Sequence, residues 1–364
     1  MFKTRQVCRR CNSRLGLFVD GSFARTWWVS NWLCSAARAA YDPACPIGLP
    51  LICLGPSKLK PPAISADEVC EIWLGPQGES VYWIRPHDER FYWYSGGNPQ
   101  ATKKIDSRAY FFFSERSGDD PLRTWLSFRD AFAEERVRKI MGTEVVGADP
   151  KEIGFSDPDE LDRSRVEYLS RRHDEKLPHQ IRSSFSLTYD HRFMAKLSLG
   201  LGFSVFGEEF LGTDYAKELR RGVWFRDGAN VEVPQLLGQT ALSKTEPLFH
   251  QCTGLPDAVT LTLFPTQKEL VLILDIGRHL SWKVVACRRD QLPDSSGWTW
   301  LGYGQTVVMY KYLQAAAMLP FPAFLMHVNS RPHPDLVHIV ERLYRASGGA
   351  LGPESPSDMG PYEQ

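Results

Sequence analysis

The chain has 364 residues, of which 43% are hydrophobic and 24% are charged, a composition typical of globular proteins that excludes an intrinsically disordered chain. Its 43 basic residues balance its 43 acidic residues, so the total charge by itself indicates no nucleic-acid partner. The uncharged apolar runs at 43–57 and 315–326 contain prolines and are too short to span a bilayer, so we predict no membrane association.

The first 60 residues predict a basic, helical segment that ends in a proline-rich link. They contain nine basic and two acidic side chains, which favours contact with phosphates or, alternatively, a solvated face that other domains compensate. Apolar residues recur at helical spacing over 1–40. Trp27, Trp28 and Trp32 lie within this run and are more typical of a helix core than of base stacking.

The segment 61–178 predicts an α+β domain with an aromatic-rich meander. Four short aromatic and β-branched runs predict antiparallel strands: 68–74, 81–84, 91–94 and 109–113. We expect a helix over 121–141. The polar, charged stretch at 150–178 predicts a helix or loop on the surface.

A second α+β domain is predicted over 179–345. We expect a strand at 181–189, one or two helices over 192–224 and a last helix at 306–318. Three consecutive strands are predicted between these helices: 259–264, 269–276 and 280–287. The segment 346–364 contains Gly, Ser, Pro and only acidic charges, which predicts a disordered tail.

The eight cysteines indicate reduced thiols rather than a disulfide framework. Disulfide frameworks belong to small secreted domains, and the start of this chain does not have the pattern of a secretory signal peptide, so we predict a cytoplasmic protein. Four cysteines occur singly in apolar surroundings, which is more typical of buried side chains than of metal ligands: Cys34, Cys45, Cys53 and Cys70.

The motif with a recognisable chemical role is the pair Cys8 and Cys11, which are separated by Arg9 and Arg10. Two cysteines at this spacing can bind one zinc ion, because a turn or helix start brings both thiolates to one side. The arginines favour the thiolate form. One pair is only half of a tetrahedral site, and the sequence contains no second Cys-x-x-Cys. A redox pair is the alternative, which would need a preceding strand in a thioredoxin-like unit.

The residues around this pair resemble the last part of an HNH endonuclease domain of the zinc-ribbon type. The stretch FKTRQVCRRCNSRLG at 2–16 contains Cys-x-x-Cys-Asn and a Leu-Gly step, and Asp20 follows. The segments RFMAKL at 192–197 and FGEEFL at 206–211 are similar to the helical part that follows such domains in bacterial proteins.

The resemblance implies a ββα-metal fold, with Cys8 and Cys11 as the second zinc pair and Asn12 at a position that helps to hold a divalent metal such as Mg²⁺. In this family a histidine deprotonates the attacking water, and the metal stabilises the charge on the phosphate and on the leaving oxygen. The implied activity is metal-dependent hydrolysis of DNA.

The chain departs from the HNH pattern upstream of Cys8. The family's first Cys pair and general-base histidine precede the second pair, whereas here seven residues precede Cys8 and the first histidine is His87. The zinc site is therefore incomplete, and we expect this chain to be inactive. We expect the reading frame to continue upstream of Met1 with the missing ligands. The alternative is a non-catalytic nucleic-acid-binding or interaction protein that retains the scaffold.

Two other groups of residues are better explained without catalysis. The pairing of PD at 158–159 with DEK at 174–176 superficially matches a nuclease pattern, but its polar surroundings favour a solvated charge run. His327, His333 and His338 are close in sequence, but the intervening prolines favour separate surface histidines. The expected architecture is therefore α+β, with a truncated ββα-metal, zinc-ribbon remnant in 1–60 ahead of two mixed helical and antiparallel β domains.

Overall fold

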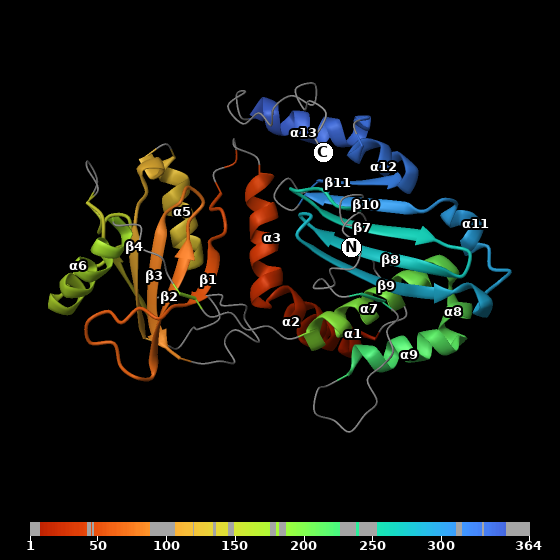
Figure 1. The fold of residues 1–364 in the computed structure, drawn as a ribbon, viewed down its shortest axis with the longest axis horizontal. Coiled ribbons are helices and arrows are strands. Elements are labelled where there is room, and N and C mark those ends of the chain that lie inside the picture. The colour runs from red at the N-terminus through yellow and green to blue at the C-terminus, as the bar shows by residue number, and fades with distance from the viewer. Residues whose placement is uncertain are drawn as a thin grey trace. The chain divides into compact units, whose positions relative to one another are not determined.

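The computed structural model describes residues 8–41, 45, 47–87, 106–118, 120–133, 136–144, 149–174, 180–181, 187–225, 238–239, 253–310, 315–329 and 331–346. The fold is mixed α+β with two mostly antiparallel sheets, which confirms the predicted fold class (Figure 1). The chain divides into two compact units. Unit 1 comprises 1–24, 35–44 and 186–364, and unit 2 comprises 25–34 and 45–185.

The residues predicted to form an N-terminal module are distributed over both units. The division falls twice near helix α3 (Trp27–Ala39), whose first part belongs to unit 2 and whose last part belongs to unit 1. Helices predominate over 8–40, as the apolar spacing predicts. The truncated ββα-metal assignment for this stretch stays a prediction, because residues 1–7 lie outside the described residues.

Unit 2 is built on a five-stranded sheet with the order β1-β2-β3-β4-β5. Its strands are β1 (Ile52–Pro56), β2 (Glu68–Leu74), β3 (Ser80–Pro86), β4 (Ser107–Phe112) and β5 (Val137–Met141). The strands β1 to β4 are antiparallel neighbours, as the meander predicts, whereas β5 pairs parallel to β4. The strand predicted at 91–94 lies outside the described residues.

The helix predicted over 121–141 is wrong in its second half. Helix α5 (Pro121–Ala131) begins at Asp120, whose side chain accepts the Arg123 backbone N–H, and ends near Phe132. The following residues form β5, because pairing with β4 and burial of its apolar side chains outweigh local helix propensity. In the polar stretch at 150–178, for which a helix or a loop was predicted, the structure has helix α6 (Glu160–Asp174).

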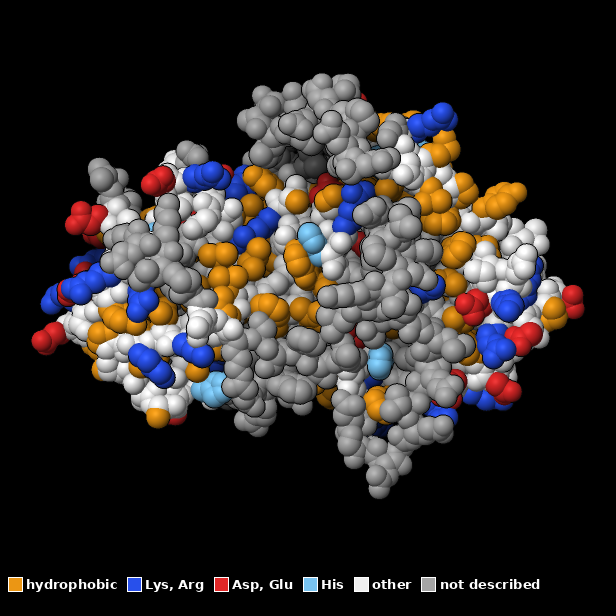
Figure 2. Space-filling model, in the orientation of Figure 1, with side chains coloured by type: hydrophobic (Ala, Val, Ile, Leu, Met, Phe, Trp, Pro, Cys, Tyr) orange, Lys and Arg blue, Asp and Glu red, His pale blue; other side chains and the backbone are white. Residues whose placement is uncertain are grey.

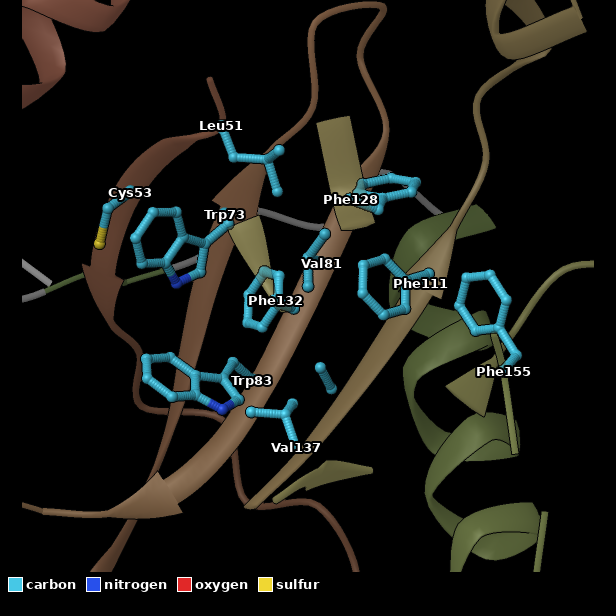
Figure 3. Packing of buried hydrophobic residues seen from close by; sticks show 11 residues of the cluster. Leu51, Cys53, Trp73, Val81, Trp83, Phe111, Phe128, Phe132, Val137 and Phe155 are labelled. Atoms are coloured by element: carbon cyan, nitrogen blue, oxygen red, sulfur yellow. The ribbon is translucent and has the colours of Figure 1, made fainter. Parts of the chain in front are cut away.

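The core of unit 2 is aromatic. Figure 3 shows Trp73, Trp83 and Phe111 on one face of the sheet, with Phe128 and Phe132 from the α5 segment packed against them. Their rings meet edge to face, with the Phe111 and Phe128 centroids 4.5 Å apart and those of Trp83 and Phe132 5.6 Å apart. The sequence produces this face because every second residue of a strand points to the same side.

Unit 1 is built on a six-stranded sheet with the order β11-β10-β7-β8-β9-β6. Its strands are β6 (Gly238–Gln239), β7 (Val259–Pro265), β8 (Glu269–Ile276), β9 (Leu280–Arg288), β10 (Gln305–Tyr310) and β11 (Ala315–Pro320). The predicted strands at 259–264, 269–276 and 280–287 are confirmed as β7, β8 and β9.

One expectation for unit 1 is wrong. The predicted helix at 306–318 is replaced by the antiparallel pair β10–β11, in which Thr306, Val308 and Tyr310 alternate inward against the core. Of the strand predicted at 181–189, residues 182–186 lie outside the described residues, Ile181 forms an isolated antiparallel bridge with Ser57, and 187–189 belong to helix α7, which begins at Leu187. The helical structure expected over 192–224 is confirmed, but it consists of three helices rather than one or two: α7 (Leu187–Phe206), α8 (Glu208–Gly212) and α9 (Asp214–Val223).

The two faces of the unit 1 sheet carry different helices. Cross-strand pairing links Trp282, Leu274, Leu261, Val307 and Met318 into one row, and directly paired residues share a face. The Trp282 end of this row lies under α7, because the indole Nε1–H of Trp282 donates a 3.0 Å hydrogen bond to Asp190. This face is therefore the α7 face.

The opposite face of the same sheet packs against α12 (Phe321–Val328) and α13 (Pro334–Ala346), which follow β11. Val308 and Leu319 from the hairpin share a buried cluster with Phe324 of α12 and Leu336 of α13. The short helix α11 (Gly297–Leu301) connects β9 to β10. The predicted tail beyond residue 346 lies outside the described residues. No helix among the described residues has both the length and the apolar character needed to cross a membrane.

Candidate metal-binding site

Cys8 is the N-cap of helix α1 (Arg9–Leu15). Its φ and ψ of −59° and 150° are extended, which turns the chain into the helix and places the thiol over the first turn. The Cys8 Sγ accepts a 3.3 Å hydrogen bond from the backbone N–H of Cys11. Both cysteines are exposed. The local sequence therefore puts two accessible sulfur atoms at the positive end of one helix, where thiolates are stabilised.

The two thiols differ in acidity. Hydrogen bonds from the side chain and backbone of Cys11 lower the pKa of Cys8, whereas the hydrogen bond with Cys8 raises the pKa of Cys11. Cys8 is therefore the more acidic thiol of the pair. A divalent cation bound to both sulfur atoms would displace the thiol protons, because thiolates rather than thiols are metal ligands.

Asn12 continues the first turn of α1 directly after the pair. Its backbone N–H donates to the Cys8 carbonyl oxygen at 2.9 Å, and its side chain is exposed. Arg10 and Arg14 are also exposed and lie four residues apart, so they project from neighbouring positions on one face of the helix. The start of helix α1 thus presents two thiols, one amide and two guanidinium groups to solvent.

The contact with α7 anchors the segment that carries the Cys pair. Helix α1 leads into the π-helical turn η1 (Gly16–Asp20) and then α2 (Gly21–Ala24). Asp20 forms an ion pair with Lys196 of α7. The ring of Phe23 stacks on that of Phe193 with centroids 4.0 Å apart. The segment that follows the Cys pair therefore packs, through Asp20 and Phe23, against the part of α7 that contains the second stretch with HNH-associated resemblance, 192–197.

Three of the remaining cysteines are buried: Cys53, Cys70 and Cys287. Burial raises the pKa of Cys70 to about 12, and the Cys53 thiol donates a 2.9 Å hydrogen bond to Glu71 Oε1. Such thiols are protonated at neutral pH and are poor metal ligands. Cys34 is half-buried and Cys45 is exposed, and Cys252 lies outside the described residues.

Within the described part of the chain, no three His, Cys, Asp or Glu side chains are grouped so that they could hold a metal ion. Cys8 and Cys11 would therefore supply two of the four ligands that a structural zinc ion requires. Their chemistry fits zinc, and the remaining ligands would have to come from outside the described residues.

Two buried carboxyl groups in unit 1 are not among the site residues predicted from the sequence. Asp190 of α7 and Asp275 of β8 have no exposed surface, and one oxygen of each lacks a hydrogen-bond partner in the described structure. Burial raises the pKa of both groups to about 7. Asp275 interrupts the apolar run of β8, a signal that marks it in the sequence, whereas nothing in the local pattern distinguishes Asp190.

The structure also corrects the expectation of three separate surface histidines. His327 lies near the end of α12, and its Nδ1 accepts a 3.0 Å hydrogen bond from the backbone N–H of His333. The two residues therefore meet across the turn between α12 and α13, despite the intervening proline. This contact orients the His327 ring and supplies no metal-binding group, because it uses the ring nitrogen as an acceptor.

Comparison of the chain with family models, with curated proteins and with solved structures finds no match.

Proposed function

We propose that this chain carries part of an HNH-type zinc-ribbon module of a metal-dependent DNA endonuclease, with Cys8 and Cys11 as zinc ligands. The observation that supports the proposal is the Cys8–Cys11 turn. The Cys8 sulfur accepts the Cys11 backbone N–H while both thiols stay exposed, and the two side chains are close enough to hydrogen-bond to each other. Asn12, which follows at once, would contribute its side-chain oxygen to a second, divalent metal such as Mg²⁺.

The positive charge on α1 supports DNA as the substrate. Arg10 and Arg14 are exposed, and the first 60 residues have an excess of basic over acidic side chains. Phosphate contacts by exposed arginines provide most of the affinity in sequence-independent DNA binding. Accessible, reduced thiols that bind zinc are typical of a cytoplasmic protein, and that location is part of the proposal.

A non-catalytic nucleic-acid-binding protein that retains this scaffold is the second candidate. It is favoured by the position of the first histidine, His87, which lies in unit 2 at the end of β3 rather than beside Asn12 in the sequence. Loss of a general base costs on the order of 10²–10⁴ in rate. Both candidates share the zinc ligands and the basic helix, and they differ in catalysis.

Titration with Co²⁺ tests the metal-binding part of the proposal. Cobalt bound to thiolates has an intense charge-transfer absorption, and we expect this band in the wild-type chain and its loss in the Cys8→Ser and Cys11→Ser variants. The matched control is Cys45→Ser, which removes an exposed thiol from unit 2 and should leave the band unchanged. Because two ligands leave zinc with open positions, we expect weak, substoichiometric zinc after purification. Absence of the band, or its loss in the control alone, contradicts the assignment of Cys8 and Cys11.

Plasmid nicking separates the two candidate functions. The protein should be expressed from the open frame that includes Met1 and whatever in-frame sequence precedes it, and assayed with Mg²⁺ or Mn²⁺. Nicking that falls strongly in Asn12→Ala supports the endonuclease. DNA binding without nicking supports the non-catalytic candidate. The chain of 364 residues should nick at background level, since no histidine precedes Asn12.

A further inference from the structure

The thiols of Cys8 and Cys11 lie close together at the start of helix α1. Cys8 is the N-cap residue and Cys11 follows it by three residues, so both side chains belong to the first turn. The Cys8 Sγ lies 3.3 Å from the backbone nitrogen of Cys11, and the two side chains are close enough to hydrogen-bond to each other. Both thiols are exposed. The pair therefore combines a neighbouring sulfur atom with access for reagents in solution.

The backbone of this turn suits a disulfide bond between the two residues. The Asn12 N–H donates to the Cys8 carbonyl oxygen at 2.9 Å, which closes the first helical turn around the pair. Cα atoms three residues apart in such a turn are separated by about 5–6 Å, and disulfides span Cα separations of roughly 4.4–6.8 Å. Rotation of the two side chains is therefore enough to join the sulfur atoms. Closure needs neither a backbone movement nor a thioredoxin-like unit around the pair.

The charge around the pair is positive. Residues 8–19 contain three arginines and no aspartate or glutamate, and the side chains of Arg10 and Arg14 are exposed. Figure 2 shows a different pattern elsewhere, because basic and acidic side chains are interspersed over the described surface of unit 1 on the face in view. A locally basic surface raises the concentration of small anions beside it. A small disulfide that carries carboxylates is such an anion, so the arginines favour its encounter with the thiols.

We propose that Cys8 and Cys11 are a redox modification site, at which a small anionic disulfide converts the two thiols into an intramolecular disulfide. One cysteine, as its thiolate, attacks the reagent, breaks its S–S bond and releases the first reagent thiol, which leaves a mixed disulfide on the protein. The other cysteine then attacks the protein sulfur of this mixed disulfide and releases the second reagent thiol. The protein loses two electrons and two protons, and the reagent gains them as two thiols.

The disulfide and a metal ion would use the same two sulfur atoms. The oxidised chain therefore cannot bind zinc through this pair, and reduction restores the ligands. Loss of zinc on oxidation depends on the proposed zinc site, whereas closure of the disulfide does not. Disulfides in proteins of reducing compartments are typically transient and redox-sensing, which is the behaviour expected of this pair.

Peptide mapping of the metal-free chain tests the modification site. Trypsin cleaves after Arg9 and Arg10, so it separates the two cysteines into different peptides, which stay joined only if a disulfide links them. The folded chain is equilibrated with glutathione disulfide and glutathione at several ratios, its free thiols are blocked with N-ethylmaleimide, and the digest is analysed without reduction. We expect the joined peptides at a ratio about tenfold lower than the one that modifies Cys45, an exposed cysteine of unit 2, because a neighbouring thiol acts at a high effective concentration.

Cys8→Ser is the matched variant, in which Cys11 can form only a mixed disulfide with glutathione. In the wild-type chain, separate mixed disulfides on Cys8 and Cys11 in place of the joined peptides overturn the proposal. Joined peptides that form only at ratios that also modify Cys45 overturn it as well, because the pair would then have no advantage over a single exposed thiol.

The rate of closure tests the role of charge. Replacing Arg10 and Arg14 by alanine should slow closure by glutathione disulfide severalfold more than closure by hydroxyethyl disulfide, which is neutral. Equal effects on the two rates exclude an anionic reagent as the preferred oxidant.

Co²⁺ titration separates this modification from the proposed zinc site. The oxidised chain should lack the thiolate charge-transfer band, and reduction with dithiothreitol should restore it. Joined peptides from a chain that gives no band in its reduced form support the disulfide and contradict the zinc ligands. A band from a chain that gives no joined peptides supports the ligands and overturns the disulfide.

Discussion

The rings of Phe23 and Phe193 are parallel, with an interplanar angle of 1° and centroids 4.0 Å apart. This contact joins the segment that follows the Cys pair to helix α7, which is 170 residues away in the sequence. Trp282 from β9 meets the Phe23 ring edge to face at 5.2 Å, so that one buried side chain connects the N-terminal segment, a helix and the sheet. Aromatic pairs of this kind contribute about 0.5–1.5 kcal/mol beyond the area that they bury.

Phe23→Ala is expected to lower the free energy of unfolding of unit 1 by about 3–5 kcal/mol, because it removes a buried ring and leaves a cavity between α2, α7 and β9. Urea denaturation followed by tryptophan fluorescence measures the change. The control is Phe18→Ala, since Phe18 lies one turn earlier with an exposed side chain and should change stability by less than about 0.5 kcal/mol. Equal effects of the two substitutions would show that the stacked contact does not anchor the N-terminal segment.

Arg10 and Arg14 are expected to contribute to DNA binding through phosphate contacts. Replacing both by alanine should weaken binding to unrelated duplexes equally and reduce the slope of log K against log salt by about 1.8, or 0.9 for each lost phosphate contact. Fluorescence anisotropy at several salt concentrations gives the slope. The matched control removes two arginines from α6, Arg163 and Arg171, whose side chains are also exposed. A slope that changes in the control and not in the α1 variant would exclude helix α1 as the contact.

Because of Asp190 and Asp275, we expect the free energy of unfolding of unit 1 to decrease as the pH rises. Burial raises the pKa of each carboxyl to about 7 in the folded protein, whereas an unfolded aspartate titrates near 3.9. Between these values the folded state binds more protons than the unfolded state, so the free energy of unfolding falls from about pH 4 to pH 7 and then levels off.

The Asp190→Asn variant should reduce this dependence, since an amide does not titrate and its oxygen can still accept the Trp282 hydrogen bond. Denaturant midpoints at pH 5, 6, 7 and 8 provide the comparison. Asp214→Asn is the control, because Asp214 is exposed and its pKa is lowered by the hydrogen bond and charge of Lys217. An unchanged pH profile in Asp190→Asn would show that Asp190 is ionised in the folded state throughout this range.

The ion pair between Glu71 of β2 and Arg85 of β3 is buried in unit 2. The Arg85 Nη2 and Glu71 Oε2 atoms are 2.8 Å apart. The side chain of Glu71 is 0% exposed and that of Arg85 is 1% exposed. Glu71→Ala should destabilise unit 2 by about 3–5 kcal/mol, because it leaves a buried guanidinium without its counter-charge. Adding Arg85→Met should recover much of that loss. Glu167→Ala, which breaks an exposed pair with Arg171 on α6, should cost less than about 1 kcal/mol.

The sequence predicted those elements whose pattern lies within a few residues. The apolar runs in 259–287, separated by the turn at 265–267 and by Gly277, were enough to place β7, β8 and β9, and the aromatic runs placed β2, β3 and β4. The position of Cys8 just before a helix also follows from local chemistry, because the cap and its hydrogen bond to Cys11 lie within a single turn. Periodicity and capping act over such short distances, and they need no information about the rest of the chain.

The tertiary structure decided the elements with ambiguous local preference and all contacts between distant segments. The Ala-rich stretch at 315–320 favours a helix in isolation, but pairing with β10 and packing under α12 make it a strand. The strand β5 forms because β4 offers it an edge, although its own residues continue a helical pattern. The contact of Phe23 with Phe193 and the burial of Asp190 against Trp282 depend on surfaces that exist only once the sheet has formed, and no short stretch of sequence specifies such a surface.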